Sequence, residues 1–179
     1  MPLEQSSCKF LVLVVKSFIY LGGIFMAHQP DNGIVENFFR RDGRLNRLRY
    51  FKRILFVGII GFALSSAIYA LEGDMLGRLS PTGDILFKVV CIVVLFPYFC
   101  LMSRRLHDMN KGDTLAYVYV ALGVLAVILM DTTVLLTESS ILQIIANGVQ
   151  FVIAIYVFFC SGTKGDNDYG PDPLEREQV

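Results

Sequence analysis

Long apolar runs alternate with short charged stretches along most of the chain. Four runs have the length and the low charge of membrane spans, because each would form a helix about 24–30 Å long against a hydrocarbon core of about 30 Å. The pattern therefore predicts an all-α integral membrane protein with four transmembrane helices in a small bundle. The predicted spans are residues 54–71, 85–102, 115–130 and 141–160.

The charges of the connecting loops predict the orientation of these spans. Basic loops alternate with loops that carry few or no basic residues, as the positive-inside rule requires. The stretch 131–140 has no basic residue, whereas the segment before the first span has Arg40, Arg41, Arg44, Arg47, Arg49, Lys52 and Arg53. We therefore expect this segment, the loop containing Arg104 to Lys111 and the C-terminal tail to be cytoplasmic.

The N-terminal extension, residues 1–37, is less regular. Its apolar part, residues 10–25, has Lys16 near the middle, where a lysine costs about 2.5–3.5 kcal/mol on insertion scales. A fifth span with the N-terminus outside and a natural start at Met26 are both open interpretations. Residues 38–160 are then the four-helix membrane domain, and residues 161–179 are a turn-rich cytoplasmic tail.

Composition supports the membrane assignment and excludes several other classes. Hydrophobic residues make up 54% of the chain and charged residues only 18%, against about a quarter charged in soluble domains. The formal net charge is +0, so we expect no nucleic-acid partner. The four cysteines and two histidines lack the spacing of metal ligands, so we predict no metal and no cofactor.

The basic segment before the first span carries the first candidate site. Arg44 and Arg47 are one helical turn apart, as are Leu45 and Leu48. Mixed basic and apolar residues at this spacing are typical of an interfacial helix that lies on anionic lipid headgroups. The alternative is that the arginines serve only to fix the topology.

A second polar stretch follows the second span directly. Asp108 reaches Arg104 at i, i+4 or Arg105 at i, i+3 if that helix continues, and His107 lies beside it. Two arginines with a His-Asp pair could cradle a phosphate, or they could satisfy one another as a polar loop. Catalysis would also need a nucleophile or a substrate pocket, and neither is evident. We therefore assign no catalytic residues and expect the protein not to be an enzyme.

The tail is rich in Gly, Asp, Asn and Pro, which predicts consecutive turns instead of a helix or strand. We expect it to form an ordered cap on the last span. Its acidic residues Asp166 and Asp168 are predicted to face the arginines of the first stretch.

One polar row lies inside a predicted span. Gln143, Asn147 and Gln150 follow each other at i, i+4 and i+7, so they share one face of the last helix. Amides in lipid need partners, and they either join helices by hydrogen bonds or line a small polar pathway.

Three polar stretches, taken together and in this order, resemble the domain-of-unknown-function 805 family. The motifs are Gly43-Arg44-x-x-Arg47-x-x-Tyr50-Phe51, then Arg105-Leu106-His107-Asp108-Met109-Asn110-Lys111, then Gly162-Thr163-Lys164-Gly165-x-Asn167-x-Tyr169-Gly170-Pro171-Asp172-Pro173. The resemblance spans residues 38–173 and implies a small bacterial inner-membrane protein, multi-pass, with no assigned activity. The chain departs from the family pattern at Gly112-Asp113-Thr114, where Ser-Gly-Trp is common, and at Phe51, where Trp is frequent.

These patterns lead to two functional expectations. The first is a non-enzymatic membrane module that binds anionic lipid headgroups or a partner protein through its cytoplasmic basic face. The binding residues would be Arg44, Arg47, Arg104, Arg105, His107 and Asp108, and the tail residues Gly162, Gly165, Asn167, Tyr169, Gly170 and Pro171 would be structural. The alternative is a small transporter or channel component that uses the face of Gln143, Asn147 and Gln150. The expected partners are the phospholipid bilayer and either a membrane protein or further copies of the chain.

Overall fold

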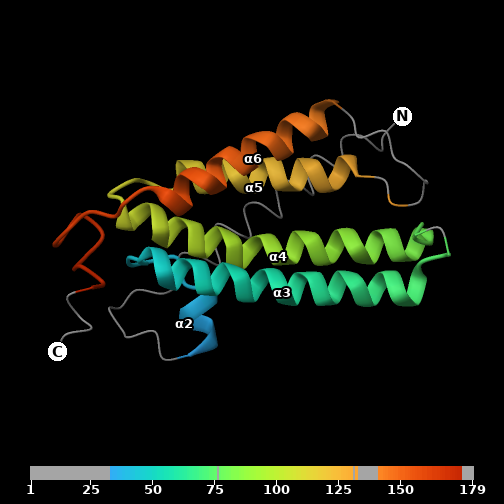
Figure 1. Ribbon diagram of the computed structural model, residues 1–179, viewed down its shortest axis with the longest axis horizontal. Coiled ribbons are helices and arrows are strands. Elements are labelled where there is room, and N and C mark those ends of the chain that lie inside the picture. The colour runs from blue at the N-terminus through green and yellow to red at the C-terminus, as the bar shows by residue number, and fades with distance from the viewer. Residues whose placement is uncertain (1–32, 76, 131, 133–140, 175–179) are drawn as a thin grey trace, which may run out of the picture.

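The computed structural model describes residues 33–75, 77–130, 132 and 141–174, and within them the regular elements are all helices. The short helix α2 (Ile34–Phe38) precedes α3 (Arg47–Glu72), α4 (Pro81–Asp108), α5 (Thr114–Leu129) and α6 (Ile141–Phe159). Figure 1 shows α3 and α4 side by side along their length, with α5 and α6 beyond α4. The tail and α2 lie toward the same end of the bundle.

The predicted spans are confirmed as helices, and two of them extend beyond their apolar runs. Helix α3 begins at Arg47 because the Asn46 side chain accepts a hydrogen bond from the Arg49 amide, at 2.8 Å, and caps the helix. Helix α4 begins at Pro81, where the Ser80 hydroxyl accepts a hydrogen bond from the Gly83 amide and caps the helix. It continues through the polar stretch to Asp108. Arg104, Arg105 and Asp108 therefore belong to a helix and not to a loop, whereas Lys111 lies after the helix end.

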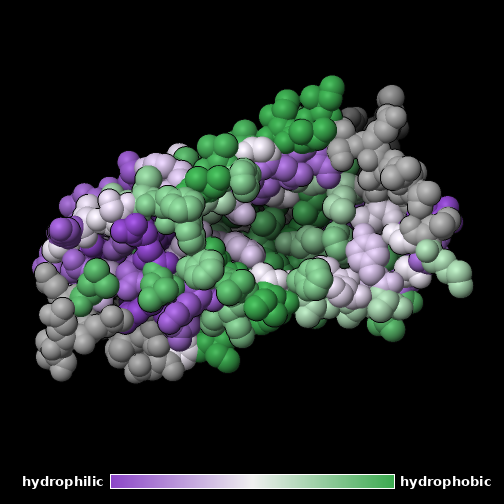
Figure 2. Space-filling view, viewed as in Figure 1, coloured by the Kyte–Doolittle hydropathy of each residue, from purple (hydrophilic) through white to green (hydrophobic). Residues whose placement is uncertain are grey.

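In the described part of the chain, three helices, α3, α4 and α6, are long and apolar enough to cross a membrane. Helix α5 is apolar but has 16 residues, about 24 Å. The outward surfaces of the long helices expose large apolar side chains, such as Phe62 at 75%, Val93 at 63% and Phe151 at 67%. Exposure on this scale is unfavourable in water and favourable in lipid. Figure 2 shows hydrophobic side chains along the helices and hydrophilic ones gathered at the tail end.

The tightest packing lies at that tail end. Every residue from 99 to 109 is buried, so the last turns of α4 are enclosed on all sides. Leu45, Tyr50, Leu106 and Val157 pack together there from four different segments. The predicted N-terminal apolar run, residues 10–25, lies outside the described residues.

Candidate functional site

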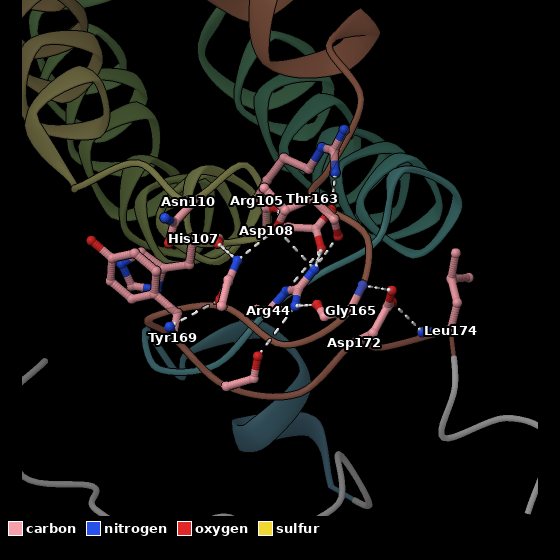
Figure 3. A network of polar contacts seen from close by, with 12 residues as sticks. Arg44, Arg105, His107, Asp108, Asn110, Thr163, Gly165, Tyr169, Asp172 and Leu174 are labelled. Atoms are coloured by element: carbon pink, nitrogen blue, oxygen red, sulfur yellow. Dashed lines mark hydrogen bonds and ion pairs between the residues drawn. The ribbon is translucent and has the colours of Figure 1, made fainter.

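The guanidinium of Arg44 lies at the centre of a polar cluster that joins the first basic stretch, the end of α4 and the tail (Figure 3). Its Nη2 donates to the Thr163 carbonyl at 2.5 Å, and its Nη1 donates to the Gly165 carbonyl at 2.6 Å and the Gly170 carbonyl at 3.2 Å. Its Nε donates to Oδ1 of Asp108 at 3.2 Å. The side chain is only 1% exposed, so this arginine binds other parts of the same chain.

Asp108 is shared by two arginines. Arg44 contacts its Oδ1, and Nη1 of Arg105 donates to its Oδ2, three residues away on the same helix. The Arg105 side chain is 0% exposed, and it also donates to the carbonyls of Val157 and Cys160. These carbonyls belong to the end of α6, so a buried cation stabilises the negative end of that helix dipole.

The tail fits against Asp108 with little clearance. The Thr163 amide donates to the Asp108 carbonyl at 2.8 Å, and the Thr163 hydroxyl donates to the same carbonyl at 3.0 Å. A Cβ on Gly162 would lie 2.1 Å from Oδ2 of Asp108, so only glycine allows this approach. Asn167 donates to the His107 carbonyl at 2.9 Å and to the Thr163 hydroxyl at 2.8 Å.

The tail also closes on itself. Asp172 accepts hydrogen bonds from the amides of Gly165 and Leu174, each at 2.9 Å. Gly165 and Gly170 have φ values of +71° and +121°, a region that glycine enters without strain. Pro171 stands between Gly170 and Asp172 and has a fixed φ. The predicted cap of consecutive turns therefore exists, and it presents its backbone carbonyls to Arg44.

A second polar group surrounds His107. The Tyr169 ring stacks on the imidazole, with centroids 4.0 Å apart and 5° between the planes. Nε2 of His107 lies 2.8 Å from Oδ1 of Asp113, and Nδ1 lies 3.3 Å from the Gly43 carbonyl. Arg41 contacts the other oxygen of Asp113 at 3.2 Å. The tail, the start of α5 and the first basic stretch are thus joined a second time.

These environments shift the pKa values of the three carboxyl groups. Burial raises the pKa of Asp108, and the positive charges of Arg105 and Arg44 limit the rise. Burial also acts to raise the pKa of Asp113, but the hydrogen bond and charge of His107 outweigh it and the pKa is lowered. The amides of Leu174 and Gly165 lower the pKa of Asp172.

The other predicted site residues lie apart from this cluster. Arg104 is buried and donates to the Glu36 carbonyl at 3.1 Å, which attaches α2 to α4. Arg47 is exposed and contacts the Phe159 carbonyl at 3.5 Å. Gln143, Asn147 and Gln150 line a cavity between the helices. Asp166 and Asp168 were predicted to face the arginines, but both are exposed. Arg44 instead binds backbone carbonyls of the tail.

Sequence reasoning did not single out Arg41, Asp113 or Asp172 as site residues. Asp113 stands directly before α5, where an acidic residue commonly marks a helix start, and this signal could have identified it. Arg41 carries no such local signal, because its partners Asp113 and Tyr117 come from another segment. Asp172 bonds within the tail and stands in the third motif, and that motif was the signal that could have identified it.

The guanidinium groups of Arg44 and Arg105 are already bound by a carboxylate and by backbone carbonyls of the same chain. A phosphate at Arg44 or Arg105 would have to displace the Asp108 carboxylate and several backbone carbonyls, so the geometry suits a structural role better than anion binding. Within the described part of the chain, no three His, Cys, Asp or Glu side chains gather as metal ligands would.

The fold and the cluster define a helical membrane protein whose polar end is held together by buried arginines. The model of the family described as "Protein of unknown function (DUF805)" matches residues 38–171. The chain belongs to this family, and the resemblance read from the three motifs is confirmed.

Two similar proteins are the inner membrane protein YhaH of Escherichia coli strain K12 and the protein of the same name in Escherichia coli O157:H7. Each is 27% identical over 144 residues, which cover 78% of this chain and 92% of the relative. No solved structure matches the chain at a significant level.

Proposed function

We propose that the protein is a non-enzymatic module of the bacterial inner membrane that binds anionic lipid headgroups through exposed basic residues at its cytoplasmic end. In this proposal the bundle crosses the membrane four times and both ends are cytoplasmic. Helix α5 is short for a span, but local thinning of the bilayer accommodates a mismatch of this size at modest cost.

The distribution of basic residues supports this orientation. The cluster end carries the basic segment 40–53 together with Arg104, Arg105, Lys111 and Lys164. At the opposite end, Arg78 pairs with Asp74 at 2.7 Å and Lys88 pairs with Asp84 at 2.8 Å. An unbalanced positive charge at one end only is what the positive-inside rule expects of the cytoplasmic side.

One observation carries the lipid-binding proposal: the first turns of α3 present basic and apolar side chains together on an exposed face. Leu48, Phe51 and Leu55 are 61%, 41% and 50% exposed, and Arg47 and Lys52 are exposed among them. At 3.6 residues per turn, all five lie within about 140° of arc. Such a face suits the boundary between acyl chains and anionic headgroups.

The buried arginines have a different part in this proposal. Arg44 and Arg105 hold the tail and the end of α6 against α4, so they frame the cytoplasmic end without touching lipid. Of the residues first expected to bind lipid, Arg47 is retained and Lys52 is added.

The test is the affinity of the purified protein for phosphatidylglycerol, measured by native mass spectrometry after gentle extraction. Arg47→Ala with Lys52→Ala should remove about 2 kcal/mol of lipid binding, at about 1 kcal/mol for each cation near an anionic surface. The control is Arg78→Ala, an exposed arginine at the other end, which should leave the bound lipid unchanged.

Equal lipid retention by the double variant and the control would contradict the proposal. A protein that co-purifies with the wild type, and is lost from the double variant while lipid stays, would identify the same face as a protein-binding surface.

A second candidate function, a small transporter or channel component, is favoured by the cavity that Gln143, Asn147 and Gln150 line. This function requires the cavity to connect with water on both sides during a transport cycle. Glycerol uptake into proteoliposomes, reduced by Asn147→Leu, would support it. Uptake equal to that of protein-free liposomes would count against it for this class of solute.

A further inference from the structure

A cavity of about 330 Å³ lies in the apolar part of the bundle, between α3, α4, α5 and α6. Its volume is at the lower end of the range found for small-molecule sites, about 300–1,000 Å³. Much of the wall is apolar, with Val94, Leu95 and Ala126 among its residues. The cavity is separate from the arginine cluster and from the exposed basic face.

The polar groups in the wall of the cavity are all uncharged. They are the side chains of Ser65, Tyr98, Gln143, Asn147 and Gln150, and among the described residues of the lining none is acidic or basic. A charged head such as phosphate would therefore meet no counter-charge in a medium of low dielectric constant. The wall suits a ligand that is uncharged and still forms hydrogen bonds.

Gln150 is held in a defined orientation. Its Nε2 donates to the Tyr119 carbonyl of α5 at 3.0 Å, and a Cβ on Gly123 would lie 2.9 Å from that nitrogen. Glycine at position 123 thus lets the amide lie close to α5. Because a carbonyl accepts and cannot donate, Nε2 must face Tyr119, and Oε1 stays available as an acceptor. The matching group on a ligand is a hydrogen-bond donor, such as the hydroxyl of an uncharged lipid.

The cavity opens sideways, between α3 and α6. Phe62 of α3 is 75% exposed and Asn147 of α6 is exposed, and both belong to the lining. Toward the arginine cluster the same two helices close, because Val57 and Ile153 are each 8% exposed and belong to the packed core. Figure 2 shows the hollow on this face, bordered by a hydrophilic patch on α6. A ligand would therefore enter from the bilayer.

We propose that this cavity binds the head of an uncharged, hydroxyl-bearing lipid of the diacylglycerol type, which enters laterally from the membrane. The lipid hydroxyl donates to Oε1 of Gln150, and the exposed amide of Asn147 lies at the entrance beside the ester groups. The acyl chains remain in the bilayer along the exposed apolar surfaces of α3 and α6. This site includes neither Arg47 nor Lys52, so lipid binding in the cavity can be tested separately from headgroup binding at the cytoplasmic face.

The experiment uses a diacylglycerol with a photoreactive group in one acyl chain, added to the full chain in phosphatidylcholine nanodiscs. Mass spectrometry should place the cross-links on α3 and α6, and unlabelled diacylglycerol should compete while phosphatidylglycerol should not. Gln150→Leu removes the acceptor and should lower labelling about tenfold, as expected for the loss of one buried hydrogen bond. Ala126→Leu should also lower it by filling the cavity.

The matched control is Val152→Leu, on the same helix but outside the cavity lining and 65% exposed, which should label like the wild type. Arg47→Ala with Lys52→Ala should label normally too. Circular dichroism would establish that each variant is folded. Labelling unchanged in both folded cavity variants would overturn the proposal, as would equal competition by phosphatidylglycerol. Cross-links between two copies of the chain through this groove would also overturn it, because they would identify a subunit interface.

Discussion

Replacing Asp108 with alanine removes the carboxylate that two buried guanidiniums share. The side chains of Arg44 and Arg105 are 1% and 0% exposed, so neither can recover its lost partner by turning to water. Removal of one member of a buried ion pair costs about 3–5 kcal/mol, mostly because a charge stays buried and unpaired. The remaining carbonyl contacts of both arginines favour the lower part of that range.

The change is measured as the free energy of unfolding in mixed micelles with a rising fraction of sodium dodecyl sulfate. The chain has no tryptophan, so far-ultraviolet circular dichroism is the suitable signal. Asp108→Asn should cost nearly as much as alanine, because the new NH₂ group faces guanidiniums that can only donate.

The control is Asp166→Ala, an acidic residue of the same polar end that is exposed, and it should change the unfolding free energy by less than about 0.5 kcal/mol. If Asp108→Ala cost no more than Asp166→Ala, the carboxylate would not organise the cluster, and the reasoning from burial would be refuted.

Three further predictions concern the same end of the molecule. Gly162→Ala places a methyl group against Asp108 and should cost about 1–3 kcal/mol of unfolding free energy, whereas Gly112→Ala, with its nearest neighbouring atom 3.8 Å away, should cost far less. Arg44→Lys removes the planar guanidinium that binds the tail carbonyls, so trypsin should cleave the tail about tenfold faster while the helix content stays unchanged. An unchanged cleavage rate would contradict the role of Arg44 in holding the tail. The stability supplied by Asp113, whose pKa is lowered, is present above its unfolded pKa of about 4 and is lost as the pH falls through the folded value. Asp113→Asn should therefore flatten the acid limb of a stability–pH profile, and an unaltered limb would argue against the ion pair.

The helices could be predicted from the sequence because their signal is local. A long apolar run must form internally hydrogen-bonded structure in lipid, and a helix does so within one segment. The ends of the helices were harder to predict, because α3 and α4 extend past the apolar runs into charged residues. The Asn46 cap stabilises the start of α3, and burial of residues 99–109 stabilises the end of α4. Hydrophobicity carries no information on either effect.

The motifs of the sequence and the contacts of the structure share several residues. The three motifs predicted that Arg44, Arg105, Asp108 and the tail glycines matter, and the structure brings these residues together. The sequence suggested that the tail acids would meet the arginines, whereas backbone carbonyls do so. The orientation of a carbonyl depends on the turn conformation, which residue types specify only in part.

Arg44 and Arg47 show most directly which properties the sequence determines and which the tertiary structure determines. They are the same residue type, three positions apart, and the sequence treated both as one basic surface. In the structure one is enclosed by the tail and the other is exposed on α3. The sequence by itself determined the membrane class, the helical segments and the charge asymmetry, because these depend on composition and spacing within one segment. Only the tertiary structure decided which arginine is buried, because its acceptors are the Asp108 carboxylate of α4 and tail carbonyls more than a hundred positions away in the chain.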